Sequence, residues 1–405
     1  MYAIIFGLSI FIQKIQKQFA IIGLFSKCFL LMPRRILIVP DKFKGSLDAI
    51  NVARVIASGW MSVWPKDIVK ILPMSDGGEG FGLIIANELN FSERSFFGCD
   101  SARRDCEVSY WVDSVSENAV VEAALSNGLY LLPNGKFHPF DLDTWGVGKL
   151  LLKLGQEKVK ECLVGIGGSA TNDAGFGMAR ALGWRFLNLD GQEILKWTEL
   201  SCLKSIIEPE SIVWPSITVA SDVLNPLLGL NGSTWVYGSQ KGLNKEDFAV
   251  ADKCFERLAK IASDKIGNDF SVHSGAGAAG GLGFGMLAFA GAKICSGFEL
   301  FAEKTNLESI ICNSDLVITA EGKMDSQTLM GKGTGQVASM SRRLGKKCIG
   351  LAGQLELSRA DRIKNDEFCH IGSIVPEIAN ATDSISNTEH YLKLLVRELA
   401  KSFPV

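Results

Sequence analysis

The chain has 405 residues, of which 47% are hydrophobic and 21% are charged. This length and balance predict a globular protein with more than one domain, most simply two. Its 42 basic and 44 acidic residues give a net charge of −2. That balance excludes a broad basic surface for nucleic acid, so an anionic ligand must be held by local groups.

The ten cysteines and four histidines show neither the spacing of a zinc site nor a disulfide framework. No two cysteines form a CxxC pair, and most lie in apolar runs. Such cysteines are typical of buried thiols in a reducing compartment. We therefore expect a cytoplasmic protein.

The first 31 residues contain two apolar blocks, Ala3–Ile12 and Phe19–Leu31. Each block is too short to span a bilayer, so no stable membrane span is expected. A basic start and a signal cleavage site are also missing. We expect the fold to begin at Met32 and residues 1–31 to be an N-terminal extension outside it. A membrane-surface anchor or a targeting peptide is the alternative.

The first strand is predicted at Arg35–Pro40, and an amphipathic helical pattern follows from Leu47. The loop between them carries Asp41, Lys42 and Lys44, and Ser46 suits the N-cap of the helix. In a parallel sheet such loops lie at the carboxyl ends of strands, where ligands bind. A solvated charged loop is the plainer alternative.

A second strand, Val69–Met74, runs into the loop Ser75–Gly80 and a helix through Leu89. Asp76 and Glu79 lie among glycines in this loop, an arrangement that suits Mg²⁺ or substrate hydroxyls. The alternative is a turn whose acidic residue favours the start of the helix.

From residue 92 to 160 the pattern changes to shorter strands, at Cys106–Asp113 and Asn118–Ala124. A helix is then predicted from Thr144 through Leu154. This stretch is typical of an α+β region, and it places a domain crossing near residue 90.

The most distinctive stretch is Gly165–Gly177, which reads GIGGSATNDAGFG. An apolar strand-like run precedes it, and a helical pattern from Ala174 to Leu182 follows. This order predicts an anion cradle, in which glycine N–H groups and the positive end of the helix face a phosphate. A tight turn before an N-capped helix is the alternative.

Two later segments allow more than one interpretation. The strand Ser216–Val223 ends at Asp222, which is either a carboxylate base or the first residue of an Asx-turn. Gly275–Gly285 contains a formal GxGxxG, but the preceding residues are too polar for the strand that a dinucleotide site requires. A glycine-rich helix packed closely on a sheet or a ligand fits this segment better.

The strand Asp315–Thr319 enters a loop that mixes both charge signs with glycines and hydroxyls, as phosphoryl-transfer sites do. Strands at Lys347–Gly353 and Phe368–Val375 and a helix at Thr388–Phe403 follow. The βα alternation at both ends predicts an α/β fold with a mostly parallel sheet. We expect a sheet domain of residues 32–90 plus 290–405, with a second domain inserted at residues 91–289.

Four motifs together resemble the glycerate kinase family of the bacterial two-domain type: DKFKGSL from Asp41, SDGGEG from Ser75, GIGGSATNDAGFG and EGKMDSQTLMGKG from Glu321. Ser221-Asp222-Val223, Gln240-Lys241-Gly242 and the glycine run 275–283 match as well, so the resemblance covers about residues 34–375. It implies a flavodoxin-like domain with an inserted second α/β domain. It also implies ATP-dependent phosphorylation of D-glycerate, in most members at the 2-hydroxyl, giving 2-phosphoglycerate and ADP.

The sequence departs from the family pattern at a few positions. Ala320 replaces a usual glycine, and Lys323 replaces a usual arginine, so Lys323 would bind phosphate as a point charge. Residues 144–148, TWGVG, replace a stretch richer in hydroxyls.

The resemblance and the loops together suggest roles for individual residues, with ATP and Mg²⁺ as cofactors. No GxxxxGK[ST] occurs, so the site is not of the Walker type. The expected catalytic residues are Lys44, Asp76, Asp173, Asp222 and Lys332. We expect phosphate to be bound by Gly167, Gly168, Ser169 and Lys323. We expect the substrate to be bound by Lys42, Ser46, Glu79 and Asn172. The expected metal ligands are Asp76 and Asp325.

Which carboxylate serves as the base stays open at this point. Three rival functions also stay open: a kinase of another small hydroxy acid, a non-catalytic protein that binds a phosphorylated metabolite, and a dinucleotide oxidoreductase that uses Gly275–Gly280.

Overall fold

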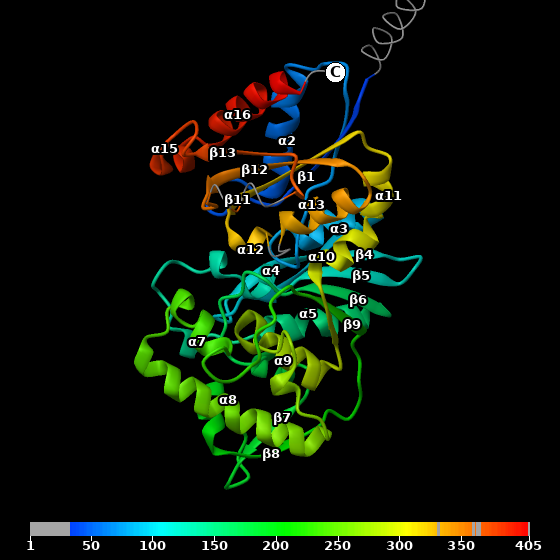
Figure 1. Ribbon diagram of the computed structural model, residues 1–405. Helices are drawn as coiled ribbons and strands as arrows, with labels where there is room; N and C mark the ends of the chain where they lie inside the picture. The colour runs from blue at the N-terminus through cyan, green and yellow to red at the C-terminus, as the bar shows by residue number, and fades with distance from the viewer. Residues whose placement is uncertain (1–32, 330–332, 359–360, 362–365, 404–405) are drawn as a thin grey trace, which may run out of the picture. The chain divides into compact units, whose positions relative to one another are not determined.

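The computed structural model describes residues 33–329, 333–358, 361 and 366–403 (Figure 1). The chain divides into two compact units: unit 1 holds the residues up to Pro73 and from Ser309 onward, and unit 2 is Met74–Glu308. The expected N-terminal extension, residues 1–31, lies outside the described residues. No helix in the described ranges is both long enough and apolar enough to cross a bilayer.

Unit 1 is built on a five-stranded sheet in which every neighbouring pair is parallel. Its order is β13-β12-β11-β1-β2. Counted along the chain, these strands are arranged 2-1-3-4-5, which is the flavodoxin-like order that the sequence implied. The strands are β1 (Arg35–Pro40), β2 (Ile68–Ile71), β11 (Leu316–Met324), β12 (Lys347–Leu355) and β13 (His370–Val375).

Helices cover both faces of this sheet, as its apolar strands require. Helices α2 (Ala49–Met61) and α16 (Thr388–Ser402) pack against each other and against one face. Helix α13 (Thr334–Arg343) packs against β11 and β12. Ile36 and Ile38 belong to the core shared with α2 and α16, whereas the intervening Leu37 does not. The shorter helices are α11 (Leu307–Cys312), α12 (Ser326–Leu329) and α15 (Ala381–Ser386).

The direction of winding reverses between β1 and β11, which are neighbours in the sheet. Ligands of doubly wound sheets bind at this point, beyond the carboxyl ends of the strands. The loop after β1 and the end of β11 therefore form the expected ligand edge of unit 1. One local prediction is wrong there: the N-cap of α2 is Asp48, which accepts from the Asn51 N–H at 2.7 Å. Ser46 instead donates its hydroxyl to the Phe43 carbonyl.

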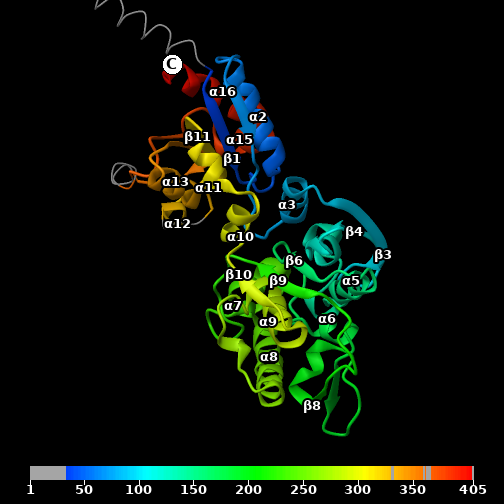
Figure 2. The ribbon, with the colours of Figure 1, turned by 90° about the vertical axis from the view of Figure 1, so that its right-hand side faces the viewer.

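Unit 2 is built on a six-stranded mixed sheet in the order β10-β9-β6-β5-β4-β3 (Figure 2). The first four strands are parallel to one another, and β4 and β3 complete the sheet as an antiparallel pair. The strands are β3 (Ser92–Cys99), β4 (Asp105–Asp113), β5 (Asn118–Glu122), β6 (Glu161–Gly165), β9 (Ser216–Ala220) and β10 (Lys293–Cys295).

The two faces of this sheet carry different helices. In β4, Tyr110 and Val112 point into the main core, whereas the ring of Trp111 lies against Gly82 of α3. Helices α3 (Phe81–Leu89) and α10 (Gly297–Lys304) pack together. The main core involves α5 (Trp145–Gln156), α6 (Phe176–Ala181) and α9 (Ala278–Ala290).

A long helix and a two-stranded hairpin extend the same core. The long helix α8 (Lys245–Ile266) packs against the hairpin of β7 (Arg185–Asn188) and β8 (Leu203–Ile207). Short helices α4 (Ala124–Asn127) and α7 (Ser233–Tyr237) also belong to unit 2. Five 3-10 helices lie at Leu129–Leu131, Pro139–Asp141, Trp197–Cys202, Ser239–Lys241 and Phe270–Val272.

The boundaries of the inserted unit differ from those expected near residues 90 and 290. Helix α3 packs on β4, β5 and β6, and α10 packs on β9. Both helices therefore belong to the second sheet, although their positions in the chain suggested the first. The observed boundaries, after Pro73 and after Glu308, follow from this packing.

Candidate active site

Three of the loops singled out from the sequence meet at one edge of the sheet of unit 2. The Gly167 N–H donates to the Gly77 carbonyl at 3.0 Å, which joins the loop after β6 to the loop before α3. Gly77 has φ +94°, and a Cβ there would lie 2.1 Å from the carbonyl oxygen of Ala220 at the end of β9. Only glycine permits both this backbone conformation and this approach.

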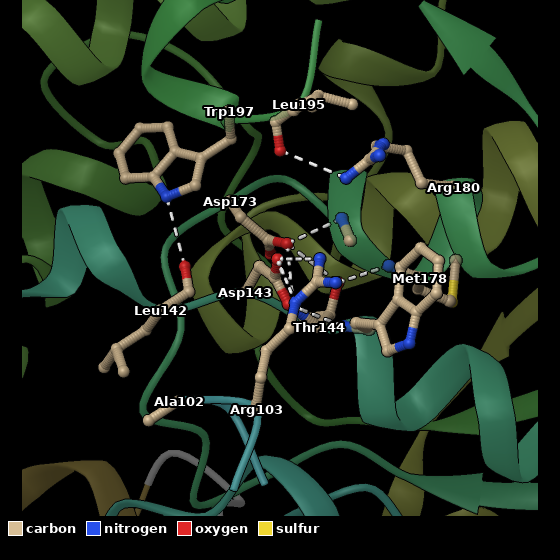
Figure 3. Close-up of polar contacts among 12 residues, drawn as sticks. Ala102, Arg103, Leu142, Asp143, Thr144, Asp173, Met178, Arg180, Leu195 and Trp197 are labelled. Carbon is tan, nitrogen blue, oxygen red and sulfur yellow. Dashed lines mark hydrogen bonds and ion pairs between the residues drawn. The ribbon is translucent and has the colours of Figure 1, made fainter. Parts of the chain in front are cut away.

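Asp173 lies in the glycine loop and is completely buried. Figure 3 shows its carboxylate among its polar contacts. Its Oδ2 accepts from the Thr144 N–H at 2.9 Å, the Thr144 hydroxyl at 2.8 Å and the Gly177 N–H at 2.9 Å. Its Oδ1 accepts from the Gly175 N–H at 3.2 Å. Burial raises the pKa of Asp173 to about 6, and nearby Asp143 acts in the same direction, whereas the hydrogen bonds oppose the rise.

This geometry bears on two expectations about the loop. The carboxylate of Asp173 already occupies the positive ends of α5 and α6, so those helix starts do not offer their N–H groups to a phosphate. Both carboxylate oxygens are used inside the protein. The contacts therefore favour a structural role for Asp173 over the expected catalytic role.

The exposed part of the loop is the turn at Gly168, where φ is +78°. Gly167 donates to Gly77, and the Ala170 N–H donates to the Asn127 carbonyl at 2.7 Å. Within the described residues, the N–H groups of Gly168 and Ser169 have no protein acceptor. The cradle predicted at residues 167–169 is thus reduced to two available donors.

A buried lysine lies directly behind this turn. The Lys241 amine donates to the Ser169 hydroxyl at 2.8 Å and to the Thr171 carbonyl at 2.6 Å. Burial lowers the pKa of Lys241 to about 7, and the charge of Asp173 opposes that shift. The sequence analysis assigned no role to Lys241; its only signal was the Gln240-Lys241-Gly242 match. Asn172, assigned to the substrate, is also buried, and its side-chain amide has no partner among the described residues.

The glycine run of α9 begins with a left-handed turn. Ala279, Gly280 and Gly281 have φ values of 57°, 75° and 82°. A Cβ at Gly280 would lie 1.8 Å from the Thr171 carbonyl oxygen and 2.7 Å from the Lys241 amine. The helix is thus packed tightly, as predicted. A 3-10 helix precedes it where a dinucleotide-binding fold would have a strand, which removes the support for an oxidoreductase.

Asp222 and Glu122 each hold the start of a helix. Asp222 Oδ1 accepts from the Ser296 hydroxyl at 2.7 Å and from the Gly297 N–H at 2.9 Å, where α10 begins. This arrangement favours a helix-capping role over both the expected base and the Asx-turn. Glu122, which the sequence analysis missed, accepts from the N–H groups of Gly80 and Gly82 at the start of α3. Burial raises the pKa of Glu122.

Asp76 and Glu79 lie exposed on the loop before α3. Asp76 Oδ1 accepts from the Gly78 N–H at 3.2 Å, which is a bond within its own turn. Both residues are exposed at the edge of unit 2 where Gly77 meets Gly167.

The remaining expected residues belong to unit 1. Lys44 is exposed and Lys42 is half-buried, both after β1. The Lys323 amine forms a 2.7 Å ion pair with Glu356, which raises the pKa of Lys323. Asp325 accepts from the Gln327 N–H at 2.8 Å at the start of α12. Lys332 lies outside the described residues.

A family model decides the classification. The model of the glycerate kinase family matches residues 36–404. The chain belongs to the glycerate kinase family. This protein is therefore a kinase, an enzyme that transfers a phosphoryl group.

Individual relatives agree with this classification. A glycerate kinase from Halalkalibacterium halodurans is 36% identical over 371 residues, which cover 90% of this chain and 97% of that protein. A glycerate 2-kinase from Escherichia coli is 35% identical over 326 residues, which cover 79% and 85% of the two chains. A crystal structure assigned to a glycerate kinase 2 from Salmonella typhimurium has a TM-score of 0.75 at 32% identity, covering 91% of this chain and 98% of that one.

The contact between Gly280 and the glycine loop can be tested by adding one methyl group. Gly280→Ala should lower the free energy of unfolding by roughly 3 kcal/mol, because it combines a left-handed alanine with a collision against fixed backbone. Gly267→Ala is the matched control, because Gly267 has φ +82° but no atom within 4 Å of the added Cβ. It should cost only about 1 kcal/mol. Equal losses in urea unfolding would contradict the packing described here.

The structural role of Asp173 predicts a pH-dependent stability. Because its pKa rises from 3.8 to about 6 on folding, its stabilisation is complete below 3.8 and is lost as pH rises through 6. Asp173→Asn should destabilise unit 2 at pH 7 by about 1–3 kcal/mol, because the NH2 group of asparagine cannot accept the hydrogen bonds that the surrounding N–H groups donate. The loss should be larger at pH 5 than at pH 7, by about 1 kcal/mol, measured by urea unfolding.

One other result would support a catalytic role for Asp173. In that case Asp173→Asn would keep wild-type stability at both pH values while losing turnover.

Proposed function

We propose that this kinase phosphorylates D-glycerate at the 2-hydroxyl with ATP, giving 2-phosphoglycerate and ADP. The observation that carries the proposal is the buried amine of Lys241, which donates to the Ser169 hydroxyl behind the exposed Gly168. Two available N–H donors above a lysine form a compact site for a phosphate or carboxylate group. The relative from Escherichia coli that is named glycerate 2-kinase supports the position of transfer.

Within unit 2, we assign the anionic groups of the ligands to the loop after β6. Gly168 and Ser169 would donate N–H groups, and Gly167 would shape the turn through its bond to Gly77. The unpartnered amide of Asn172 would bind a polar group of the substrate, because a buried amide without partners is costly. Glu79 would accept a substrate hydroxyl.

Within unit 1, we assign the cations after β1 and β11 to phosphate and substrate groups. Lys44 and, by resemblance, Lys332 would neutralise the transferring phosphoryl group, since phosphoryl transfer depends on charge stabilisation. Lys323 would contact phosphate as a point charge, and Lys42 and Ser46 would bind the substrate.

An exposed carboxylate of unit 2 could help to hold a magnesium ion. In the described ranges, no three or more Asp, Glu, His or Cys side chains are grouped to hold a metal. Mg²⁺ in kinases is commonly held by one or two carboxylates together with substrate phosphates. Exposed Asp76 would supply such a carboxylate, and Asp325 would be the alternative. When bound, the ion neutralises charge on the phosphates.

As part of the same proposal, we infer that the protein acts in the cytoplasm. The nine cysteines of the described residues are free thiols, as is usual in a reducing compartment.

The decisive experiment identifies the product. The full chain is incubated with Mg-ATP and D-glycerate, and the phosphoglycerate isomer is assigned by NMR. We expect 2-phosphoglycerate together with one ADP per product. The 3-phospho isomer would overturn the 2-position, and turnover only with another hydroxy acid would change the acceptor. Ligand-induced stabilisation without ADP formation would instead indicate a non-catalytic binder of phosphorylated metabolites.

The role of Asp76 is tested by a magnesium titration. Asp76→Asn should raise the Mg²⁺ concentration needed for half-maximal activity by about tenfold or more, because a neutral amide holds the ion weakly. Glu398→Gln, on the exposed face of α16, should leave that concentration unchanged. An unaltered magnesium dependence in Asp76→Asn would remove Asp76 from the metal site.

A further inference from the structure

Glu321 lies at the ligand edge of unit 1 and had no role in the sequence analysis. It is near the carboxyl end of β11, which pairs with β1 where the winding of the sheet reverses. The Asp41 N–H donates to the carbonyl of neighbouring Ala320 at 2.7 Å, so the loop after β1 lies beside it. This is where a doubly wound sheet binds its ligand.

The two oxygens of Glu321 have different surroundings. The hydroxyls of Thr328, at 2.9 Å, and of Thr334 both donate to Oε1. Oε2 receives no hydrogen bond from the described part of the chain. A Cβ at Gly333 would lie 3.9 Å from Oε2, so this side of the carboxylate is bordered by a residue without a side chain. One oxygen is anchored and the other is left for a ligand.

The groups around Glu321 set the pKa of its carboxyl near neutral pH. Burial raises its pKa to about 7, and the carboxylates of Asp41 and Asp325 act in the same direction. The hydroxyls of Thr328 and Thr334 oppose the rise. On the β12 side its register partner is Ala352, which carries no charge. A general base works best when its pKa lies near the working pH.

We propose that Oε2 of Glu321 is the proton acceptor for the substrate hydroxyl. This inference rests on the proposed function, and it names the base that the sequence left open. The O–H bond of the hydroxyl breaks and its proton passes to Oε2. The hydroxyl oxygen forms a bond to the γ-phosphorus of ATP, and the bond from that phosphorus to the bridging oxygen breaks and releases ADP. The proton then leaves Glu321 to solvent.

The first test compares two glutamine variants of the full chain. Glu321→Gln keeps an oxygen for the two threonines but cannot accept the proton, so kcat should fall at least about 100-fold while KM for both substrates changes little. Glu398→Gln is the matched control on α16, where Glu398 forms an exposed ion pair with Lys401. It should keep wild-type kcat.

The second test follows the pH dependence, which a merely structural role would not move. Wild-type kcat should rise with pH through about 7, because the base must lose its proton before catalysis. Thr328→Val and Thr334→Val each remove a hydroxyl that lowers the pKa of Glu321, so each should move this rise to higher pH. A direct titration of the Glu321 carboxyl carbon by NMR should give the same shift without relying on activity.

The outcomes separate this inference from the proposed function. A wild-type protein that makes no ADP with D-glycerate overturns the proposed function. An active wild type with a Glu321→Gln variant within about threefold of its kcat overturns the role of Glu321. A variant that loses activity through KM alone, or threonine variants with an unmoved pH profile, also overturns it, because Glu321 would then bind substrate without accepting the proton.

Discussion

The buried carboxylate of Asp173 is the interaction on which the glycine loop depends. It receives N–H groups from the starts of α5 and α6, which are separated in the chain by more than 20 residues. A buried charge is tolerated only when such donors surround it. The loop before α6 therefore takes its shape from an ion inside the protein, and a ligand finds that shape already formed.

Lys241 completes this arrangement from the opposite side of the loop. It donates to the Thr171 carbonyl, two residues before Asp173, and the charge of Asp173 favours its protonated form. The loop is thus held by a cation and an anion that do not form a direct ion pair with each other. Both pKa values move toward neutrality because both groups are buried, and the charge of Asp173 limits the shift of Lys241.

Much of the fold followed from the sequence because the buried parallel strands are apolar runs. Strands β1, β6 and β12 lie close to the predicted positions, and the doubly wound order of unit 1 agrees with the resemblance. Strands β3 and β10 were missed for different physical reasons. The first, SERSFFGC, is an edge strand with four exposed residues at its start, and the second has three residues, so neither shows an apolar period.

The site was predicted less well than the fold. Glycine positions such as Gly77 and Gly168 could be predicted, because a tight turn leaves a local signal in the sequence. The roles of the acids could not, because their partners are distant. Asp222 bonds to Gly297, 75 residues away, and Glu122 bonds to Gly80, 42 residues away. A carboxylate that caps a distant helix and one that binds a ligand look alike in a sequence.

The contacts of these acids also explain why a base is better placed on Glu321. A base must gain and lose a proton at every turnover. Asp173 and Asp222 accept backbone N–H groups on both oxygens, so neither has an oxygen left to accept a proton from a substrate. Glu321 is anchored by hydroxyls, which can rotate and can accept as well as donate. Its protonation therefore leaves the surrounding backbone bonds intact.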